Sequence, residues 1–367
     1  MVASGFLAIG SGPAGLSAAE TFRSRHRHIP VRMLSADPAL PYAKPPLSKE
    51  YLCGRQVNID LHSADWFVRN DVDLIRGVTV ERIDVDAQEV ITAGGVHFPY
   101  WHLVLAPGSA TVPLDVPGAD LAQPLRSFAD AVALRMAARH ARAAVVIGAG
   151  LIGCEAAACL AGLGIETTLV AHETVPLQRR FGIDVGERVV KMLSDVGVRF
   201  IGASTVAAVD DGGVVLATGE TVDGDVVVAA TGVRPDIRLA IAAGLTTRDG
   251  RVVVDEHMHT SARNIFAAGD ITLARNVVAG GRVICEHWRD AAQQGLIAGL
   301  TAAGYPAVWD MVSGFTCTIG KFTMRYRGWS APHDSCTLVE RRSGFSVDYE
   351  ADGSVVGTLT ATASPVS

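Results

Sequence analysis

The stretch FLAIGSGPAG, residues 6–15, decides the fold of this chain. Its apolar start predicts a short buried strand, and the glycines predict a tight turn into a helix that runs from about Pro13 into FRSRHRH. Glycines at this spacing allow a tight turn, a close approach of backbone to a pyrophosphate, and close packing of helix on strand. The N-terminus of the helix offers free N–H groups to the phosphates. The stretch therefore predicts a dinucleotide-binding unit.

A second copy of this pattern, VVIGAGLIGCE, occupies residues 145–155. It again follows an apolar strand and opens an Ala-rich helix. Two such units in one chain predict two adenine dinucleotides, and the usual pairing is flavin adenine dinucleotide (FAD) with a nicotinamide coenzyme.

The residues that follow the next strand of each unit bear on ribose recognition. Asp37 follows the strand at 31–34 and is a candidate acceptor for a ribose hydroxyl, with an ordinary loop aspartate as the alternative. After the strand at 167–170 the chain reads Ala171-His172-Glu173. Glu173 would favour the free hydroxyl of NAD. The candidate partners for the 2′-phosphate of NADP are His172, Arg179 and Arg180, so the coenzyme preference stays open.

A third signal is NIFAAGD, residues 264–270, where a strand ending in Gly269-Asp270 places a carboxylate within reach of a flavin ribityl hydroxyl. Its partner segments are ATGVRP, residues 230–235, and Ala106-Pro107-Gly108. Both follow apolar strands, as expected for chain crossings between two nucleotide-binding domains.

Composition limits the class of protein. The chain has 367 residues, 49% of them hydrophobic, which is ample for two or three domains. A formal net charge of −6 argues against nucleic-acid binding. No secretory signal and no apolar run of ~18 residues is present, so we expect no membrane contact and a cytoplasmic location. The six cysteines form no metal-type pairs, which predicts reduced thiols and no metal site.

These motifs together resemble the pyridine-nucleotide–disulfide oxidoreductase superfamily. Within it, the chain is most similar to the FAD-dependent NAD(P)H:ferredoxin reductases that supply oxygenases and cytochromes P450. The matching segments are Gly10 to Gly15, PYAKPPLSK, IGAGLIGCE, ATGVRP, NIFAAGD and EHWRDAAQQG, in the family's order.

The resemblance implies an α/β fold with two Rossmann-like, glutathione-reductase-like dinucleotide-binding domains and a small, shortened α+β/antiparallel C-terminal domain. The FAD domain would comprise 1–108 and 240–305, the NAD(P) domain 109–239, and the C-terminal domain 306–367. Strand-like stretches in the last region are 314–319, 323–329, 337–341, 344–349 and 355–361, with turn signals at 331–333 and 351–353.

The resemblance also implies two sets of binding residues. For FAD they are Gly10, Gly12, Pro13, Ala14, Gly15, Asp37, Lys44, Pro45, Ala106, Gly108, Gly269, Asp270, Glu286, His287 and Trp288. For NAD(P) they are Gly148, Gly150, Leu151, Ile152, Gly153, Glu155, His172, Glu173, Arg179, Ala230, Thr231 and Gly232. Trp288 would stack near the nicotinamide pocket, with a core tryptophan as the alternative.

Lys49 and Glu155 are the catalytic candidates that the resemblance implies. A lysine beside the flavin stabilises the anionic reduced form, and a neighbouring carboxylate keeps that lysine ordered. A plain surface lysine is the alternative for Lys49.

The cysteines bear on where the electrons go. Disulfide reductases of the superfamily carry a C-x4-C pair beside the flavin, and Cys53 has no partner at that spacing. Cys154 and Cys159 have the spacing but lie on the helix of the second unit. There, at ~3.6 residues per turn, they point roughly 140° apart, so we expect packing residues. A single reactive thiol, Cys53 or Cys285, is the alternative to electrons leaving the flavin directly.

The expected function is therefore hydride transfer from NADH or NADPH to FAD, followed by single-electron transfer to a [2Fe-2S] ferredoxin, in a monomer or homodimer. One alternative is reduction of a quinone, nitro compound, metal ion or dioxygen; another is an NADH-sensitive flavoprotein like apoptosis-inducing factor. Candidate docking cations in the C-terminal domain are Lys321, Arg325, Arg327, Arg341 and Arg342, although six acidic residues share it.

The chain departs from the family pattern at four places. Pro107 stands where the first crossing usually has threonine, Lys44 where arginine is common, and Ala171 where an acid is usual. The C-terminal domain is short, and this puts the electron acceptor in doubt more than the fold.

Overall fold

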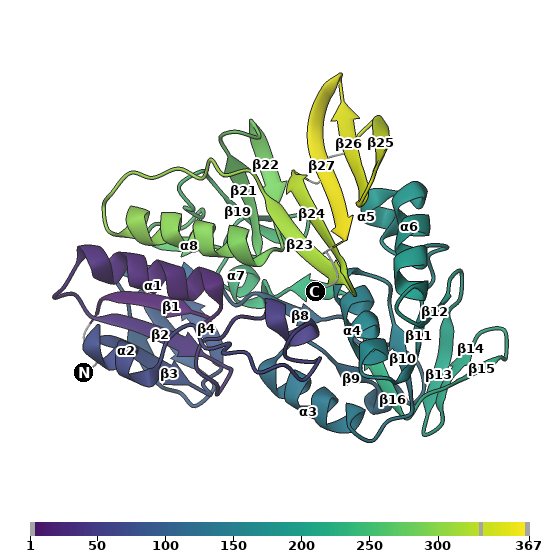
Figure 1. Cartoon of the computed structure of the whole chain (residues 1–367). Helices are drawn as coiled ribbons and strands as arrows, with labels where there is room; N and C mark the ends of the chain where they lie inside the picture. Colours follow the sequence, from purple (N-terminus) through teal and green to yellow (C-terminus); the bar gives the residue numbers. More distant parts are fainter. Residues whose placement is uncertain (1–3, 330–332, 364–367) are drawn as a thin grey trace.

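Two parallel five-stranded sheets form the centre of the computed structural model, which describes residues 4–329 and 333–363 (Figure 1). In strand order, the first sheet consists of β20 (Ile265–Ala267), β7 (His102–Leu105), β1 (Phe6–Ile9), β2 (Val31–Ser35) and β3 (Val72–Arg76). The second consists of β12 (Val198–Ile201), β11 (Glu166–Val170), β10 (Ala143–Ile147), β16 (Val226–Ala229) and β9 (Gln123–Pro124). The α/β class predicted from the sequence is confirmed.

Each glycine motif forms the predicted turn between a strand and a helix. β1 is buried at every position and leads into α1 (Pro13–Arg25), and β10 leads into α4 (Leu151–Gly162). Gly10 and Gly148 both have φ of 104°, a conformation that side-chain-bearing residues rarely adopt. A Cβ on Gly15 would overlap the carbonyl of Gly10. The turns therefore exist because glycine alone permits them.

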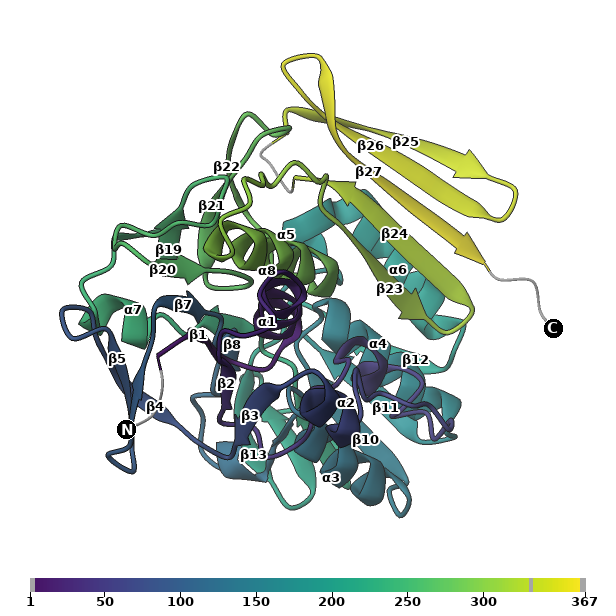
Figure 2. The ribbon, with the colours of Figure 1, turned by 90° about the vertical axis from the view of Figure 1, so that its left-hand side faces the viewer.

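Helix α8 (Trp288–Ala302) lies alongside α1, on one side of the first sheet (Figure 2). The two helices approach closely because α8 presents glycines to α1: a Cβ on Gly295 would overlap the backbone of Ala14, and one on Gly299 would overlap that of Ala18. This packing holds the first glycine loop and the start of α8 in a constant relation.

Smaller elements surround the two sheets. The antiparallel sheets are β4 (Val80–Asp84), β5 (Glu89–Thr92) and β6 (His97–Pro99); β13 (Val206–Asp210), β14 (Gly213–Leu216) and β15 (Thr221–Asp223); and the pair β8 (Ser109–Thr111) and β17 (Val233–Pro235). A mixed sheet contains β18 (Thr247–Arg248), β19 (Arg251–Val254), β21 (Thr272–Asn276) and β22 (Gly281–Ile284). The remaining helices are α2 (Ala64–Arg69), α3 (Phe128–Ala138), α5 (Gln178–Phe181), α6 (Ile183–Ser194), α7 (Arg238–Ala242) and the 3-10 turns η1 (Pro45–Ser48) and η2 (Ala119–Leu121).

The pairing of β8 with β17 brings the two predicted crossing segments side by side. Val233 pairs with Thr111 and Pro235 with Ser109. Segments that lie far apart in the sequence thus run together between the two parallel sheets.

The C-terminal region forms the predicted antiparallel sheet (Figures 1 and 2). Its order is β23 (Gly314–Ile319), β24 (Phe322–Gly328), β27 (Ser354–Ala363), β26 (Gly344–Ala351) and β25 (Ser335–Arg341). Its buried face shares one apolar cluster with α4 and α6, through residues such as Ile319, Met324 and Leu359. The turn predicted at 351–353 joins β26 to β27. Of the turn predicted at 331–333, residues 331 and 332 lie outside the described part.

The basic run at the end of α1 has a structural explanation. Arg23 is buried, donates to the carbonyls of His26, Arg27 and Asp71, and pairs with the carboxylate of Asp71 at 3.5 Å.

Within the two described ranges, no helix has the length and hydropathy needed to cross a membrane.

The glycine contact between α1 and α8 makes a first prediction. Gly295→Ala forces the helices apart and should lower the free energy of unfolding by roughly 1–3 kcal/mol, measured by urea denaturation. Gly162→Ala is the matched control, because a Cβ there would meet no atom within 4 Å; it should stabilise the helix or leave it unchanged. Equal unfolding midpoints for wild type and Gly295→Ala would contradict this account of the packing.

Candidate functional site

A cavity of about 1330 Å³ opens where the carboxyl end of β1, the start of α8 and the edge of the C-terminal sheet meet. Its lining runs from Gly10 on the first glycine loop to Glu155 on α4 and to Tyr326 on β24. The volume exceeds the ~300–1,000 Å³ that is usual for one small ligand. The cavity therefore has room for an extended dinucleotide and a second reactant.

The N-terminus of α1 forms one wall of this cavity. Gly12 caps the helix, no side chain caps the free N–H groups, and Pro13 occupies the first turn. A Cβ on Gly12 would meet no protein atom within 4 Å, so the space in front of the loop belongs to the cavity. Exposed N–H groups at the positive end of a helix dipole suit a pyrophosphate.

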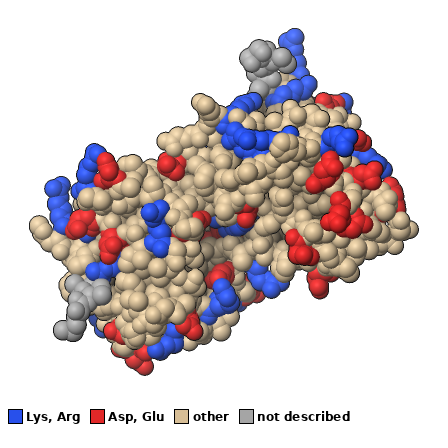
Figure 3. All heavy atoms as spheres, turned by 90° about the horizontal axis from the view of Figure 1, so that it is seen from below, with Lys and Arg blue, Asp and Glu red and all other residues tan. Residues whose placement is uncertain are grey.

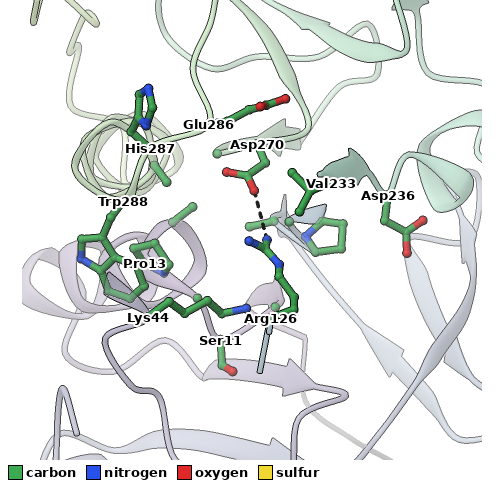
Figure 4. A pocket seen from close by; sticks show the side chains of 18 of the residues that line it. Ser11, Pro13, Lys44, Arg126, Val233, Asp236, Asp270, Glu286, His287 and Trp288 are labelled. Carbon is green, nitrogen blue, oxygen red and sulfur yellow. Dashed lines mark hydrogen bonds and ion pairs between the residues drawn. The ribbon is translucent and has the colours of Figure 1, made fainter. Parts of the chain in front are cut away.

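Two cations belong to the lining of the same cavity. Lys44 and Arg126 both line the cavity, and Figure 4 shows the Lys44 side chain extending toward Arg126. Burial, together with the charge of Arg126, lowers the pKa of Lys44 to about 8. An anion in the cavity would relieve that repulsion, so these residues also favour a phosphate-bearing ligand.

Arg126 in turn is held by Asp270, the predicted acceptor at the end of β20. The Arg126 guanidinium lies 3.2 Å from Asp270 Oδ2, and the Ser109 hydroxyl donates to the same oxygen at 2.8 Å (Figure 4). Within the described residues, both of these contacts fall on Oδ2, and Oδ1 of Asp270 leaves an acceptor for a ligand hydroxyl. Arg126 belongs to no sequence motif, and for this reason its place in the site was not predicted from the sequence.

Asp37 is a further carboxylate in the lining of this cavity. Its carboxylate accepts from the Tyr42 hydroxyl at 2.8 Å and from the Ala39 N–H at 2.9 Å. Burial and the bond to Asp37 raise the pKa of Tyr42 well above its usual value, so Tyr42 stays a donor. The Asp37 carboxylate is thus oriented while still lining the cavity.

Lys49 and Glu155 meet as the resemblance implied. Lys49 Nζ lies 2.8 Å from Glu155 Oε2 and donates to the carbonyl of Pro45 at 3.0 Å. Glu155 is almost fully buried and also accepts from the Ser48 hydroxyl at 2.6 Å and the Thr318 N–H at 3.0 Å. A side chain of Lys49 that is only 17% exposed is not the surface lysine of the alternative interpretation.

The segment Glu286-His287-Trp288 enters the wall just before α8. Trp288 is half-buried beside Pro13 in the cavity wall, so it is not a core tryptophan (Figure 4). His287 stacks on Phe315 with ring centroids 4.5 Å apart. Burial and the charge of Arg180 lower the pKa of His287 to about 4, so its ring is neutral near pH 7.

Arg180 is held by two neighbours in the cavity wall. The sequence offers it as a candidate partner for the 2′-phosphate of NADP, and this stays a prediction; its guanidinium donates to His287 Nε2 at 3.2 Å and lies 5.2 Å from the centre of the Phe315 ring. Both Arg180 and Phe315 line the cavity. Only the packing of β23 against α5 reveals this neighbourhood, because the residues are far apart in sequence.

The residues predicted to bind FAD or NAD(P) divide into two groups by their position relative to the cavity. Those that line the cavity are Gly10, Gly12, Pro13, Ala14, Asp37, Lys44, Pro45, Ala106, Gly108, Leu151, Ile152, Gly269, Asp270, Glu286, His287 and Trp288. Those outside its lining are Gly15, Gly148, Gly150, Gly153, His172, Glu173, Arg179, Ala230, Thr231 and Gly232. Gly15 and Gly153 each pack against the first glycine of their own loop. Glu173 follows β11, and its Oε1 lies 3.3 Å from Nε2 of the exposed His172. Arg179 is also exposed.

The expectation of six reduced cysteines was wrong. Cys53 and Cys159 form a disulfide, with their Cα atoms 5.4 Å apart. Sequence spacing gave no sign of it, because 106 residues separate the two. The interpretation of Cys154 and Cys159 as packing residues holds for Cys154, which is a buried free thiol, and was wrong for Cys159. Cys285 is also buried and free, and burial raises the pKa of its thiol to about 12, which disfavours a reactive thiolate.

These residues fit FAD. The uncapped helix terminus with Lys44 and Arg126 would hold its pyrophosphate, the carboxylates of Asp37 and Asp270 would accept ribose and ribityl hydroxyls, and Lys49 would stand at the reactive end.

Lys44 makes the second prediction. Its pKa of about 8 in the free protein should rise when an anionic pyrophosphate binds, so binding takes up a proton above pH 8. FAD affinity of the FAD-depleted protein should therefore be constant below pH 8 and fall above it, by up to about tenfold per pH unit.

Fluorescence titration of FAD between pH 7 and 10 measures this dependence. Lys44→Met should flatten the profile, while Lys191→Met, at an exposed position on α6, should keep it. A wild-type profile that is flat to pH 10 would show that Lys44 does not face the bound anion.

Comparison with known proteins places this arrangement in a family. The family model described as pyridine nucleotide-disulphide oxidoreductase matches residues 6–295. The chain is 35% identical over 313 residues to the ferredoxin--NAD(+) reductase component of the anthranilate 1,2-dioxygenase system of Burkholderia cepacia, covering 83% of this chain and 77% of that protein. It is 35% identical to rhodocoxin reductase of Rhodococcus erythropolis over 298 residues, covering 78% of this chain and 69% of that protein.

Solved structures agree over nearly the whole chain. The ferredoxin reductase for the CYP199A2 system of Rhodopseudomonas palustris superposes with a TM-score of 0.91 at 28% identity, covering 98% of this chain and 91% of that one. The covalent putidaredoxin reductase–putidaredoxin complex gives a TM-score of 0.92 at 26% identity, covering 98% and 90%. The glycine loops, the cavity and these matches together show that the chain belongs to the pyridine nucleotide-disulphide oxidoreductase family.

Proposed function

We propose that this protein is an FAD-dependent NAD(P)H:ferredoxin reductase that supplies electrons to an oxygenase or a cytochrome P450. One observation carries the proposal: Lys49, from the loop after the first glycine unit, and Glu155, from the helix of the second unit, pair at 2.8 Å in the wall of one cavity. The two nucleotide-binding units thus converge on one point. The relatives named ferredoxin and rhodocoxin reductases support the same activity.

In this proposal, the residues of the cavity would hold FAD, which would supply the capacity to take up a hydride from the nicotinamide and to pass on single electrons. The chain supplies binding and electrostatics. Lys49 places a positive charge at the reactive end of the cavity, and Glu155 fixes the position of that charge through its own contacts with Ser48 and Thr318. A charge held in advance requires no rearrangement during the reaction.

The aromatic wall of the cavity would shape the nicotinamide side. Trp288 and Phe315 present ring surface there, and His287 is neutral and stacked, so it contributes packing and not charge. Exclusion of water by these rings strengthens the field of Lys49.

We further propose the domain division expected from the sequence: FAD-binding 1–108 with 240–305, NAD(P)-binding 109–239, and a C-terminal domain 306–367. The coenzyme would be NADH. Glu173 follows β11, at a position where a carboxylate binds a free ribose hydroxyl. The relative from the anthranilate 1,2-dioxygenase system is named a ferredoxin--NAD(+) reductase component. A cytoplasmic location belongs to the same proposal.

The acceptor would be a [2Fe-2S] ferredoxin that reaches the cavity beside the C-terminal sheet. Of the candidate docking cations, Arg325 and Arg327 line the cavity, whereas Arg341 donates to the Ser346 hydroxyl at 3.0 Å. Charges of both signs are present on the face seen in Figure 3, where acidic side chains gather toward one end. Docking would therefore depend on the local cations at the cavity and not on the net charge of −6.

Anaerobic titration with NADH and then NADPH, followed at the flavin absorption band, tests the proposed function. Complete bleaching by one equivalent of NADH, followed by reoxidation on adding a [2Fe-2S] ferredoxin, is expected. Fast reoxidation by a quinone with none by ferredoxin would favour a small-molecule reductase. A protein that binds no FAD would refute the proposal.

The third prediction concerns the ion pair. Lys49→Met and Glu155→Gln should each slow flavin reduction by NADH roughly tenfold to hundredfold, because each disturbs the preorganised charge at the reactive end. Stopped-flow absorbance under anaerobic conditions measures the rate, and FAD content should stay at one per chain.

Lys191→Met and Glu187→Gln, on the outer side of α6, are matched controls with the same changes of charge. Their rates should equal that of the wild type. If both ion-pair variants also reduced at the wild-type rate, Lys49 and Glu155 would have no part in the mechanism.

A further inference from the structure

The disulfide and the proposed catalytic ion pair join the same two elements, one helical turn apart. Lys49 pairs with Glu155, and Cys53 bonds to Cys159. In each element the cysteine follows the charged residue by four positions. Residues four apart on a helix lie on the same face, so Glu155 and Cys159 both face the loop that carries Lys49.

The backbone of Lys49 lies between the two links. Its carbonyl accepts from the Cys53 N–H at 2.8 Å and lies 3.5 Å from Cys159 Sγ. Leu52 is fully buried beside the same helix, in the apolar cluster that includes Ala156 and Leu160. A change at the sulfurs therefore acts directly on the backbone that positions Lys49.

The two cysteines lie behind the ion pair, as seen from the cavity. Lys49 and Glu155 line the cavity, and neither Cys53 nor Cys159 belongs to its lining. Cys53 is half-buried and is followed by the exposed residues Gly54 to Gln56, whereas Cys159 is buried. A thiol from solution can thus reach the disulfide at Cys53.

The distance between the backbones fits a bond that forms and breaks without large movement. The Cα–Cα distance of 5.4 Å lies within the usual disulfide range of roughly 4.4–6.8 Å. In the dithiol form, Cys159 can donate its S–H to the Lys49 carbonyl, a weak bond in place of a covalent one.

We propose that Cys53 and Cys159 form a reversible thiol–disulfide modification site whose reactants are thiols and disulfides from solution, and that it tunes the Lys49–Glu155 pair. The inference rests on the proposed function for its effect on hydride transfer. The disulfide holds the loop to α4 and keeps Lys49 in place. The dithiol form loosens the loop and slows flavin reduction.

The Cys53–Cys159 bond would be reduced and re-formed by thiol–disulfide exchange. In reduction, an external thiolate attacks Cys53 and the Cys159 thiolate leaves, giving a mixed disulfide. A second external thiolate then releases Cys53, so two electrons and two protons pass to the cysteines and an external disulfide forms. Oxidation by glutathione disulfide reverses these steps and yields two molecules of glutathione.

Thiol titration of the FAD-loaded protein tests the site without reference to activity. After incubation with glutathione disulfide and removal of reagents, four thiols should titrate under denaturing conditions, because four cysteines are free. After dithiothreitol all six should titrate. Cys53→Ser should give the same count before and after treatment. Six thiols in the glutathione-disulfide-treated wild type would overturn the proposal.

Flavin reduction by NADH tests the effect of the disulfide. The dithiol form of the wild type should reduce about fivefold more slowly than the disulfide form, and glutathione disulfide should restore the rate. Cys53→Ser and Cys159→Ala should be slow in both conditions while retaining FAD. Cys336→Ser, at an exposed free cysteine, should behave as the wild type does.

Two outcomes would overturn the regulatory effect. One is an equal rate in the disulfide and dithiol forms. The other is a need for two equivalents of NADH to bleach the disulfide form, because the flavin would then reduce the pair directly. Failure of the proposed function would look different: NADH would not bleach the flavin in either form, whatever the thiol count.

Discussion

A buried ion pair between Lys49 and Glu155 is the interaction on which the arrangement of this protein depends. Glu155 belongs to the helix of the second glycine unit, Lys49 and Ser48 to the loop after the first, and Thr318 to the C-terminal sheet. One carboxylate therefore gathers contacts from three parts of the chain. A buried charge is tolerated when its partners satisfy it, and removing any of them leaves an uncompensated group. This condition fixes Lys49 and Glu155 in the wall of the cavity.

The glycine turns supply the other constraint. Gly10 and Gly148 have the same φ of 104°, and the backbone of a crossing segment, at Ala106 and Ala230 respectively, stands where a side chain would be. Because the strand–glycine–helix turn occurs twice, two helix N-termini lie at the carboxyl ends of strands in the two parallel sheets. The same small residues recur where α8 meets α1, at Gly295 and Gly299. Close backbone approach, which only glycine permits, thus builds both the binding loops and the helix packing around them.

The cations and aromatic rings of the cavity show where local reasoning stops. Arg126 lies between a short strand and a capped helix, in a stretch with no motif, yet it pairs with Asp270, 144 residues away. Arg180 follows the second unit in sequence, and no local pattern reveals that it contacts His287 and Phe315. Such pairings follow from how sheets and helices pack. Sequence periodicity reports only which face of an element is apolar.

By itself the sequence determined the two strand–glycine–helix units, the crossing segments, the antiparallel character of the last region and the pairing of Lys49 with Glu155 that the family resemblance implied. These features arise from residues close in sequence or from motifs whose spacing has one physical use. The tertiary structure alone decided that Cys53 meets Cys159, that Lys44 extends toward Arg126, and that Phe315 lines the cavity. The reason is that contacts between elements distant in sequence depend on the packing of the whole chain, which no local pattern encodes.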